Sequence, residues 1–220
     1  MLIACSVTTE QITDALFAAR LCELSPFRLD KAERAVSREA RAQSLAASFA
    51  LSEALRRIGK REKEMEYGIG ENGKPFFKNA PSLHFSLSHT QGRALAVLAD
   101  APVGCDIEKV RPVKPGIARR FFNAAEADML EALPPAQSPA AFFKIWTAKE
   151  SYQKLTGCGL SLPMSALSIS LSPGPVLIPP AGGENALLAL YDGFPEYICA
   201  LCAVNPDRPF LPIDINLLSD

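Results

Sequence analysis

Long hydrophobic runs are missing from this 220-residue sequence. Its longest apolar stretches, such as residues 197–204, have the length of a strand, whereas a membrane-spanning helix needs roughly 20 apolar residues. An excess of charge of one sign is missing as well, because 23 Lys and Arg residues face 24 Asp and Glu residues. Nucleic-acid binding through bulk charge is therefore disfavoured. The sequence predicts neither a membrane nor a nucleic-acid partner.

The common nucleotide and hydrolase motifs are also missing. No Gly-x-Ser-x-Gly elbow is present, which argues against a Ser/His hydrolase of that kind. The glycine pairs at 68 and 70 and at 157 and 159 lack the spacing of a phosphate-binding loop or a dinucleotide fingerprint. Nucleotide binding of those two kinds is disfavoured.

The cysteines are too few and too scattered for a disulfide-stabilised secreted domain. Six are spread from position 5 to position 202, in a chain long enough to bury its own core. Cys199 and Cys202 form a Cys-x-x-Cys pair, but on a strand they face opposite sides, so we interpret them as core residues. The first five residues lack the basic flank of a secretory signal. These features predict a cytoplasmic protein with reduced thiols.

Residues 1–102 contain the pattern of one long helix followed by strands. Helical periodicity predicts a helix over residues 37–58, with Ser37 as its N-cap and Gly59 after its end. The sequence Glu71-Asn72-Gly73-Lys74-Pro75 predicts a turn. Alternation from Leu83 predicts a strand that pairs as a hairpin with residues 94–99.

Residues 103–220 repeat that order of elements. We expect helices over residues 124–133 and 140–156, the second ended by Gly157, and strands over residues 103–110, 165–171, 186–191 and 197–204. The sequence therefore predicts an α+β fold of two similar halves, residues 1–102 and 103–220.

Two carboxylates lie on the predicted strand over residues 103–110. Asp106 and Glu108 are two residues apart, so both project from one face, while Cys105 and Ile107 face the other side. Carboxylates placed so closely repel each other unless a cation lies between them, and Mg²⁺ commonly binds one or two carboxylates together with substrate phosphates. A solvent-facing polar strand edge is the alternative interpretation.

A second polar cluster follows Trp146 on the predicted helix over residues 140–156. Glu150 and Lys154 are four residues apart on one helical face. They are expected either to form an exposed ion pair, worth about 0.3–0.5 kcal/mol, or to complete a metal site and to neutralise phosphate charge. Periodicity alone leaves both interpretations open.

The two histidines differ in their predicted surroundings. His84 lies on the polar face of its strand and is expected to be structural. His89 would lie on the apolar face if the strand continued, so we expect the strand to end there and to release the ring into a loop. A loop histidine beside Ser88 could bind phosphate.

Taken in order, several short motifs together resemble the phosphopantetheinyl transferase superfamily, across about residues 38–162. Their order and spacing are similar to the surfactin-synthetase-activating type, a single chain with two pseudo-symmetric halves. The motifs are Gly73-Lys74-Pro75, Phe85-Ser86-Leu87-Ser88-His89, Gly104-x-Asp106-Ile107-Glu108, Phe121-Phe122 with Glu126, Trp146-x-x-Lys149-Glu150-Ser151-x-x-Lys154 and Gly157-x-Gly159-Leu160.

The resemblance implies transfer of the phosphopantetheine arm of coenzyme A onto a serine of an acyl, polyketide or peptidyl carrier protein. Adenosine 3′,5′-bisphosphate would be released, and the enzyme would be a monomer. In each half a long helix would pack on a small, mostly antiparallel sheet, with the active site between the halves.

The resemblance also implies roles for individual residues. Asp106, Glu108 and Glu150 would hold Mg²⁺ against the pyrophosphate. Lys154 would stabilise the leaving phosphate, and Glu126 or Glu150 would help to deprotonate the serine. Lys74, Ser88 and His89 would bind the phosphates of coenzyme A.

One position departs from the family pattern. The family usually places a basic residue before the Ser44-Leu45 pair to bind the 3′-phosphate, and this chain has Gln43. Arg41, or Arg28 with Lys31, is expected to substitute. Two other functions stay open: a metal-dependent phosphodiester hydrolase with the same carboxylates, and a non-catalytic module that binds carrier domains.

Overall fold

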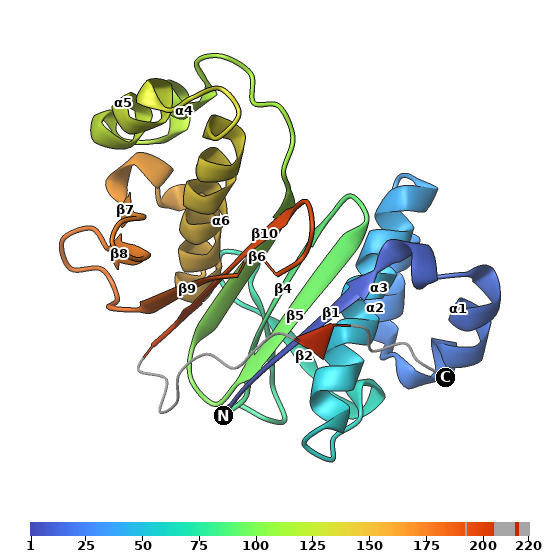
Figure 1. Ribbon diagram of the computed structural model, residues 1–220. Coiled ribbons are helices and arrows are strands. Elements are labelled where there is room, and N and C mark those ends of the chain that lie inside the picture. Colours follow the sequence, from blue (N-terminus) through green and yellow to red (C-terminus); the bar gives the residue numbers. More distant parts are fainter. Residues whose placement is uncertain (192, 205–213, 216–220) are drawn as a thin grey trace.

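The computed structural model describes residues 1–191, 193–204 and 214–215 (Figure 1). The side chains of Gln11, Leu160, Asp214 and Ile215 are not described, so the last residue of the Gly157-x-Gly159-Leu160 motif lies outside the described side chains. Among the helices of the described part, none is both long enough and apolar enough to cross a membrane.

The first half of the chain builds a sheet covered by the long helix α3 (Arg38–Arg56). As predicted, Ser37 caps this helix, because its Oγ accepts a hydrogen bond from the Ala40 backbone N–H. The strand order is β11-β1-β5-β4, and α3 packs its buried alanines and leucines on one face of the sheet. The strands are β1 (Leu2–Thr8), β4 (His84–Thr90), β5 (Arg93–Ala99) and β11 (Asp214–Ile215).

The second half builds a smaller antiparallel sheet covered by α6 (Ser138–Thr156), which ends at Gly157 with φ 71°. Its strands are β6 (Val103–Lys109), β9 (Leu187–Tyr191) and β10 (Tyr197–Ala203), in the order β6-β10-β9. Side chains alternate along β10: Cys202 packs toward α6, and Cys199 packs away from it. Both cysteines are buried, which confirms that they belong to the core.

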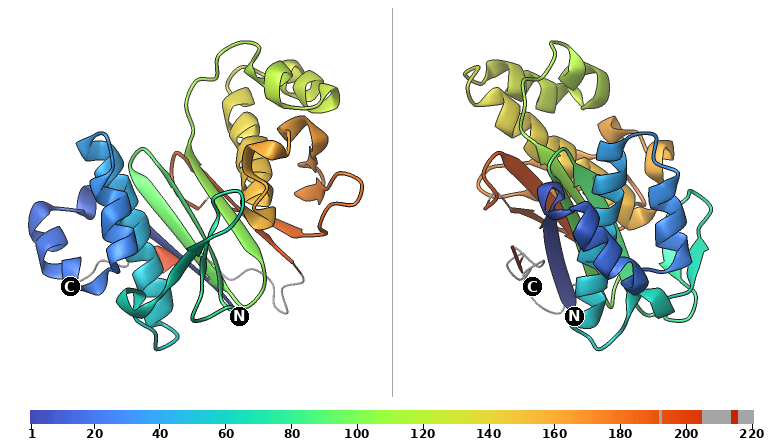
Figure 2. Two further views of the ribbon diagram at one scale, coloured as in Figure 1. Left: turned by 180° about the vertical axis from the view of Figure 1, so that it is seen from behind. Right: turned by 90° about the vertical axis from the view of Figure 1, so that its right-hand side faces the viewer.

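The two sheets face each other across a shared apolar layer, with one long helix outside each of them. This inner layer combines residues of β1 and β5 with residues of β6 and β10. Figure 2 shows α3 and α6 on opposite sides of the two sheets. The predicted α+β fold, with a long helix on a small sheet in each half, is therefore confirmed.

Shorter elements complete the structure. They are the helices α1 (Asp14–Arg20), α2 (Pro26–Glu33), α4 (Ile117–Phe121) and α5 (Ala124–Ala132) and the strands β2 (Tyr67–Ile69), β3 (Pro75–Phe77), β7 (Ser168–Ser170) and β8 (Val176–Ile178). Short 3₁₀ helices cover Thr9–Gln11, Leu21–Glu23, Glu62–Glu64, Gly159–Ser161 and Met164–Ala166. The predicted turn at Asn72-Gly73 connects β2 with β3.

One predicted strand is shorter than expected. Of residues 165–171 only Ser168–Ser170 form a strand, because a 3₁₀ helix occupies Met164–Ala166. The division at residue 102 remains a prediction: β6 begins at Val103, but β11 pairs in parallel with β1 in the first sheet. Residues 192, 205–213 and 216–220 of the predicted second half lie outside the described residues.

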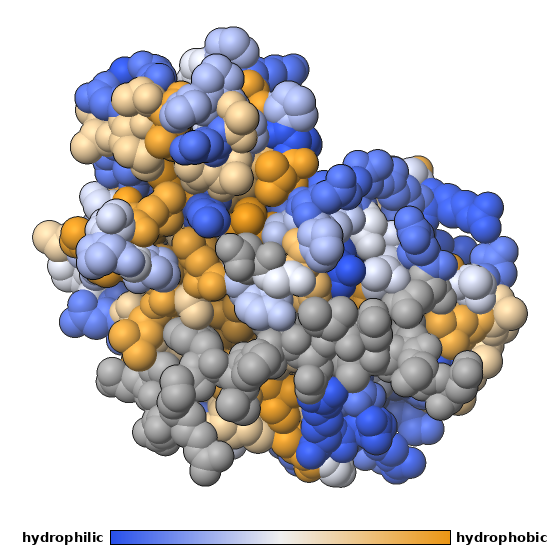
Figure 3. Space-filling view, in the orientation of Figure 1, coloured by the Kyte–Doolittle hydropathy of each residue, from blue (hydrophilic) through white to orange (hydrophobic). Residues whose placement is uncertain are grey.

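The surface of the second half carries exposed apolar side chains on its short strands. Val176 and Ile178 of β8 and Leu187 of β9 each expose more than half of their surface. Figure 3 shows hydrophobic residues gathered on this side of the molecule, whereas hydrophilic residues dominate over the upper part of α3.

Candidate active site

The two halves meet where β4 runs beside β6. Strand β6 pairs with β10 along one edge, and two serine hydroxyls of β4 take the place of a strand partner at the other edge. Ser86 Oγ accepts a hydrogen bond from the Cys105 N–H (3.0 Å), and Ser88 Oγ accepts one from the Ile107 N–H (3.3 Å). These side chains satisfy backbone donors that would otherwise be buried without partners.

Gly104 brings β6 close to α6. A Cβ atom at this position would lie only 1.9 Å from the Ser151 carbonyl oxygen and 2.4 Å from the Leu155 nitrogen. Asp106 and Glu108 follow on the same face of the strand as Gly104, while Cys105 and Ile107 belong to the apolar layer between the sheets. The predicted alternation of side chains is therefore confirmed, and both carboxylates face α6 and its surroundings.

Lys154 of α6 forms an ion pair with Asp106. Its Nζ donates to Asp106 Oδ1 (2.7 Å) and to Ser88 Oγ (2.9 Å), and the Ser88 hydroxyl itself donates to Asp106 Oδ1 (2.7 Å). Burial opposes the charge of this lysine, but the Asp106 carboxylate outweighs it and raises the pKa of Lys154. The exposed pair between Glu150 and Lys154, one of the two interpretations of the sequence, is not the ion pair that the structure contains.

Negative charge accumulates next to this pair. Burial raises the pKa of the Glu150 carboxyl, and the Asp106 and Glu108 carboxylates raise it further. Glu108 Oε2 accepts hydrogen bonds from Thr90 (3.1 Å) and Arg111 (2.8 Å). The described residues contain no group of three His, Cys, Asp or Glu side chains placed closely enough to hold a metal ion by themselves.

A cavity of about 330 Å³ opens beside these residues. Glu150 and Lys154 of α6 line one wall, and the turn before β3 lines another. Four cationic side chains contribute to the lining: Arg28, Lys31, Lys74 and Lys154. A cavity with so many cations and carboxylates close by suits a ligand that carries several phosphate groups together with a divalent cation.

Arg28 and Lys31, one turn apart on α2, both line this cavity. Arg28 is only 1% exposed, and its Nη1 has no hydrogen-bond partner within the described part of the chain. Sequence reasoning named this pair only as an alternative. The signal for it was Ser25-Pro26, an N-cap followed by proline, which predicts a helix that carries both cations on one face.

Lys74 lies in the wall between this cavity and a second one of about 530 Å³, which His84 also lines. Its Nζ donates to the backbone oxygens of Val103 (3.1 Å) and Leu155 (2.9 Å). Burial lowers the pKa of Lys74 to about 8. This lysine thus reaches from the first half to the end of α6, with two of its three N–H donors bound to the protein.

The strand that contains His89 does not end where the sequence suggested. Strand β4 continues to Thr90, because His89 pairs with Ala94 across the hairpin, and His89 is partly exposed there. Burial lowers the pKa of His89, and nearby cations, Lys154 first among them, lower it further. Among the described residues, the lining of the first cavity includes neither Ser88 nor His89.

Glu126 makes structural contacts, and among the described residues it is not part of the lining of the first cavity. Its Oε2 accepts from the buried Lys149 Nζ (2.6 Å), and its Oε1 accepts from the Ile169 N–H (2.7 Å). Asn123 and Glu126 also form a capping box at the start of α5. Glu126 therefore has a structural role in this fold, and its suggested role as a base stays a prediction.

Arg41 also lies away from the cavity lining. Its guanidinium lies over the Phe17 ring, 5.0 Å from the ring centroid. This cation–π contact ties the start of α3 to α1. Of the suggested substitutes for Gln43, the structure brings Arg28 and Lys31 to the cavity and leaves Arg41 outside it.

The chain is similar to one family of known proteins. Residues 102–202 match the family model of the 4′-phosphopantetheinyl transferase superfamily. The chain is 31% identical over 199 residues to 4′-phosphopantetheinyl transferase Sfp of Bacillus subtilis (strain 168), covering 89% of this chain and 88% of that protein. It is 40% identical over 146 residues to another 4′-phosphopantetheinyl transferase of Bacillus subtilis, covering 65% of each.

Two solved structures also match part of the chain. Holo-[acyl-carrier-protein] synthase of Thermotoga maritima is 21% identical, with a TM-score of 0.38 over 46% of this chain and 61% of that chain. A holo-(acyl-carrier-protein) synthase of Bacillus anthracis, in complex with CoA (3′,5′-ADP), is 16% identical, with a TM-score of 0.40 over 46% of this chain and 93% of that chain.

Proposed function

This chain belongs to the 4′-phosphopantetheinyl transferase superfamily, and from that premise we propose that it moves the phosphopantetheine arm of coenzyme A onto a serine of an acyl, polyketide or peptidyl carrier protein. The serine oxygen forms a bond to the phosphorus that carries the arm. The bond from that phosphorus to the bridging oxygen of the pyrophosphate breaks. Adenosine 3′,5′-bisphosphate leaves with the electron pair of that bond.

The observation that carries this proposal is the division of charge around the first cavity. Arg28 and Lys31 supply positive charge at one wall, where a buried guanidinium nitrogen has no partner among the described residues. Lys154 supplies it at the other wall, next to Asp106. Coenzyme A carries a 3′-phosphate and a pyrophosphate, so two separate cationic places match its two separate anionic groups. We assign α2 to the 3′-phosphate and Lys154 to the pyrophosphate.

The residues beside Lys154 fit Mg²⁺. Asp106 Oδ2 is buried and has no hydrogen-bond partner within the described part of the chain, which is the state expected of an oxygen that can accept a cation. Asp106 and Glu150 would hold the ion, with Glu108 as the third carboxylate. Two protein carboxylates suffice when substrate phosphates complete the shell. When bound there, Mg²⁺ would neutralise charge on the pyrophosphate oxygens.

Protein side chains would accept the serine proton and stabilise the leaving group. Glu150 is the carboxylate suited to accept the serine proton, since it lines the cavity in which the reacting groups would lie. Lys154 is held by Asp106 and Ser88 in one orientation, so its ammonium meets the charge that grows on the leaving bisphosphate. Ser88 uses its hydroxyl to hold this lysine.

We also propose that the protein acts as a monomer in the cytoplasm, with halves at residues 1–102 and 103–220 and with neither nucleic acid nor membrane as a partner. The six cysteines are free thiols, as suits a reducing compartment.

Intact-mass spectrometry of several apo-carrier proteins, incubated with coenzyme A, Mg²⁺ and the purified protein, tests the proposal. The expected result is a mass gain of one phosphopantetheine group on the carrier serine, abolished by EDTA. Hydrolysis of coenzyme A without a carrier would instead identify a phosphodiester hydrolase. Carrier binding without either reaction would identify a binding module.

A further inference from the structure

A buried carboxylate holds the helix that carries Arg28. Glu62, in the 3₁₀ helix before β2, is 0% exposed. Its Oε2 accepts from the Ser25 backbone N–H (2.5 Å), and its Oε1 accepts from the Ser25 hydroxyl (2.9 Å) and from the Tyr67 hydroxyl. Ser25 is the N-cap of α2. Both oxygens of Glu62 are therefore used to fix the beginning of this helix.

Aromatic stacking strengthens the same attachment. The rings of Phe27 on α2 and Tyr67 on β2 are parallel within 8°, with centroids 4.5 Å apart. Tyr67 thus contacts α2 through its ring and Glu62 through its hydroxyl. We call Glu62 and Tyr67 the α2 socket. Because Ser25, Phe27 and Arg28 lie within one turn of α2, the socket sets where that turn lies.

Arg28 depends on this placement because its own partners are few. Its Nε donates to Ser48 Oγ (3.0 Å), whose hydroxyl is held in turn by the Ser44 carbonyl (2.7 Å). Its Nη1 has no hydrogen-bond partner in the described part of the chain, and only 1% of the residue is exposed. A buried guanidinium is costly unless negative charge lies close to it. The Glu62 carboxylate is close enough for its negative charge to favour the charged form of Arg28. Among the described residues Glu62 and its neighbours make no bond to Nη1, which leaves that nitrogen for a ligand.

We infer that Glu62 is a positioning residue, which holds Arg28 through α2 and thereby sets the preference of the cavity for ligands with a second phosphate group, at the 3′ position. This inference rests on the proposed function, and it concerns a residue outside the cavity lining. A displaced α2 moves Arg28 and Lys31 together, because they lie three residues apart on one helix. Selectivity for the extra phosphate then falls, while the carboxylates and Lys154 keep their places.

Calorimetric titration with adenosine 3′,5′-bisphosphate and with adenosine 5′-monophosphate tests the inference without a carrier protein. The quantity measured is the ratio of the two dissociation constants. We expect Glu62→Gln to reduce the preference for the bisphosphate by about tenfold. The amide keeps the size of the side chain, but it removes the charge and turns one acceptor into a donor that faces Ser25. Tyr67→Phe, which keeps the ring, should give a smaller loss in the same direction.

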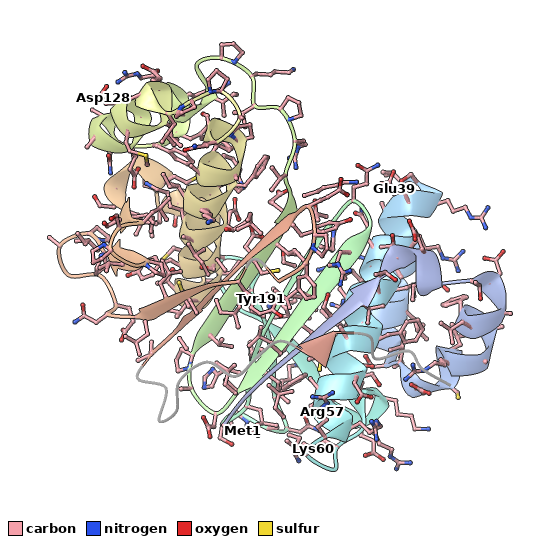
Figure 4. The ribbon with its side chains drawn as sticks, viewed as in Figure 1. Met1, Glu39, Arg57, Lys60, Asp128 and Tyr191 are labelled. Atoms are coloured by element: carbon pink, nitrogen blue, oxygen red, sulfur yellow. The ribbon has the colours of Figure 1, made fainter. Side chains whose placement is uncertain are left out.

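Glu53→Gln is the matched control. Glu53 is also a buried acid, 5% exposed, but it holds Arg56 and Arg57 at the far end of α3, where Figure 4 labels Arg57. This variant should lose stability and keep the binding ratio. Equal losses in the Glu53 and Glu62 variants, or an unchanged ratio in a folded Glu62→Gln protein, would overturn the inference.

Two further outcomes separate the inference from the proposed function. If Glu62→Gln does not fold, Tyr67→Phe and Ser25→Ala carry the test, since each removes one hydrogen bond to Glu62 and keeps the charge. An unchanged ratio in both would then refute the role of the socket. A wild-type protein that binds neither nucleotide and modifies no carrier would refute the proposed function itself, whereas a failed socket leaves carrier modification intact.

Discussion

Replacing Gly104 by alanine tests whether the close approach of β6 and α6 builds the site. The added methyl group would lie 1.9 Å from the Ser151 carbonyl oxygen, where ordinary contact begins near 3.4 Å. The obstacle is helix backbone, which has no side-chain rotation with which to move away. The helix and the strand must therefore separate by about 1.5 Å, the difference between these two distances.

The cost follows from this displacement. Overpacking of a buried position destabilises a protein by about 1–3 kcal/mol, and by more where backbone blocks the new group. In a chain of this length each kcal/mol lowers the melting temperature by about 2–4 °C, so we expect a loss of about 2–12 °C. The same shift separates Lys154 on α6 from Asp106 on β6. Misplacement of about 1 Å reduces catalysis by about a hundredfold.

Thermal unfolding and transfer kinetics on a purified carrier protein measure the two effects. Gly174→Ala is the control, because a Cβ there meets nothing within 4 Å. The reasoning is refuted if the Gly104→Ala protein melts and turns over like this control. Loss of stability with unchanged kcat would mean that Gly104 contributes to stability and does not set the geometry of the site.

Three other perturbations have expected outcomes. Lys154→Ala should lower kcat in the carrier-transfer assay by about a hundredfold or more, the scale of single electrostatic stabilisers; a kcat near that of the wild type would remove the lysine from the mechanism. Lys149→Met leaves the buried Glu126 carboxylate without its cation, so thermal unfolding should show a loss of about 3–5 kcal/mol; an unchanged melting temperature would contradict this. Burial lowers the pKa of Lys74 to about 8, so the unfolded chain binds the extra proton above that pH. The stability of the wild type relative to Lys74→Met should therefore rise between about pH 8 and pH 10.5 and stay flat below pH 8, as measured by denaturation across that range.

Local patterns predicted the parts of the site that depend on one element. Alternation on β6 placed Asp106 and Glu108 on one face, and a glycine correctly ended α6. The same kind of reasoning reached the wrong result at His89, since the end of a strand depends on hairpin pairing, which carries β4 to Thr90.

Contacts between distant segments were harder to predict. Arg28 lines one cavity together with residues of α6 that are more than a hundred positions away in the sequence. Helical or strand periodicity cannot predict that these segments lie close together. Glu126 is a different case, because Asn123-x-x-Glu126 is a visible capping box. Its structural role could have been recognised from the sequence, whereas its buried partner Lys149 could not.

The first cavity takes its charged side chains from segments that are distant in the sequence. Most cations of the cavity, Arg28, Lys31 and Lys74, come from the first half, and the carboxylates Asp106 and Glu150 come from the second. Serine hydroxyls along β4 satisfy the β6 edge in place of backbone pairing, and the ends of β6 and α6 are fastened by Lys74. Under the proposed function, the two separate phosphate groups of the ligand would contact both halves, because Arg28, Lys31 and Lys74 come from one half and Lys154 with the carboxylates comes from the other.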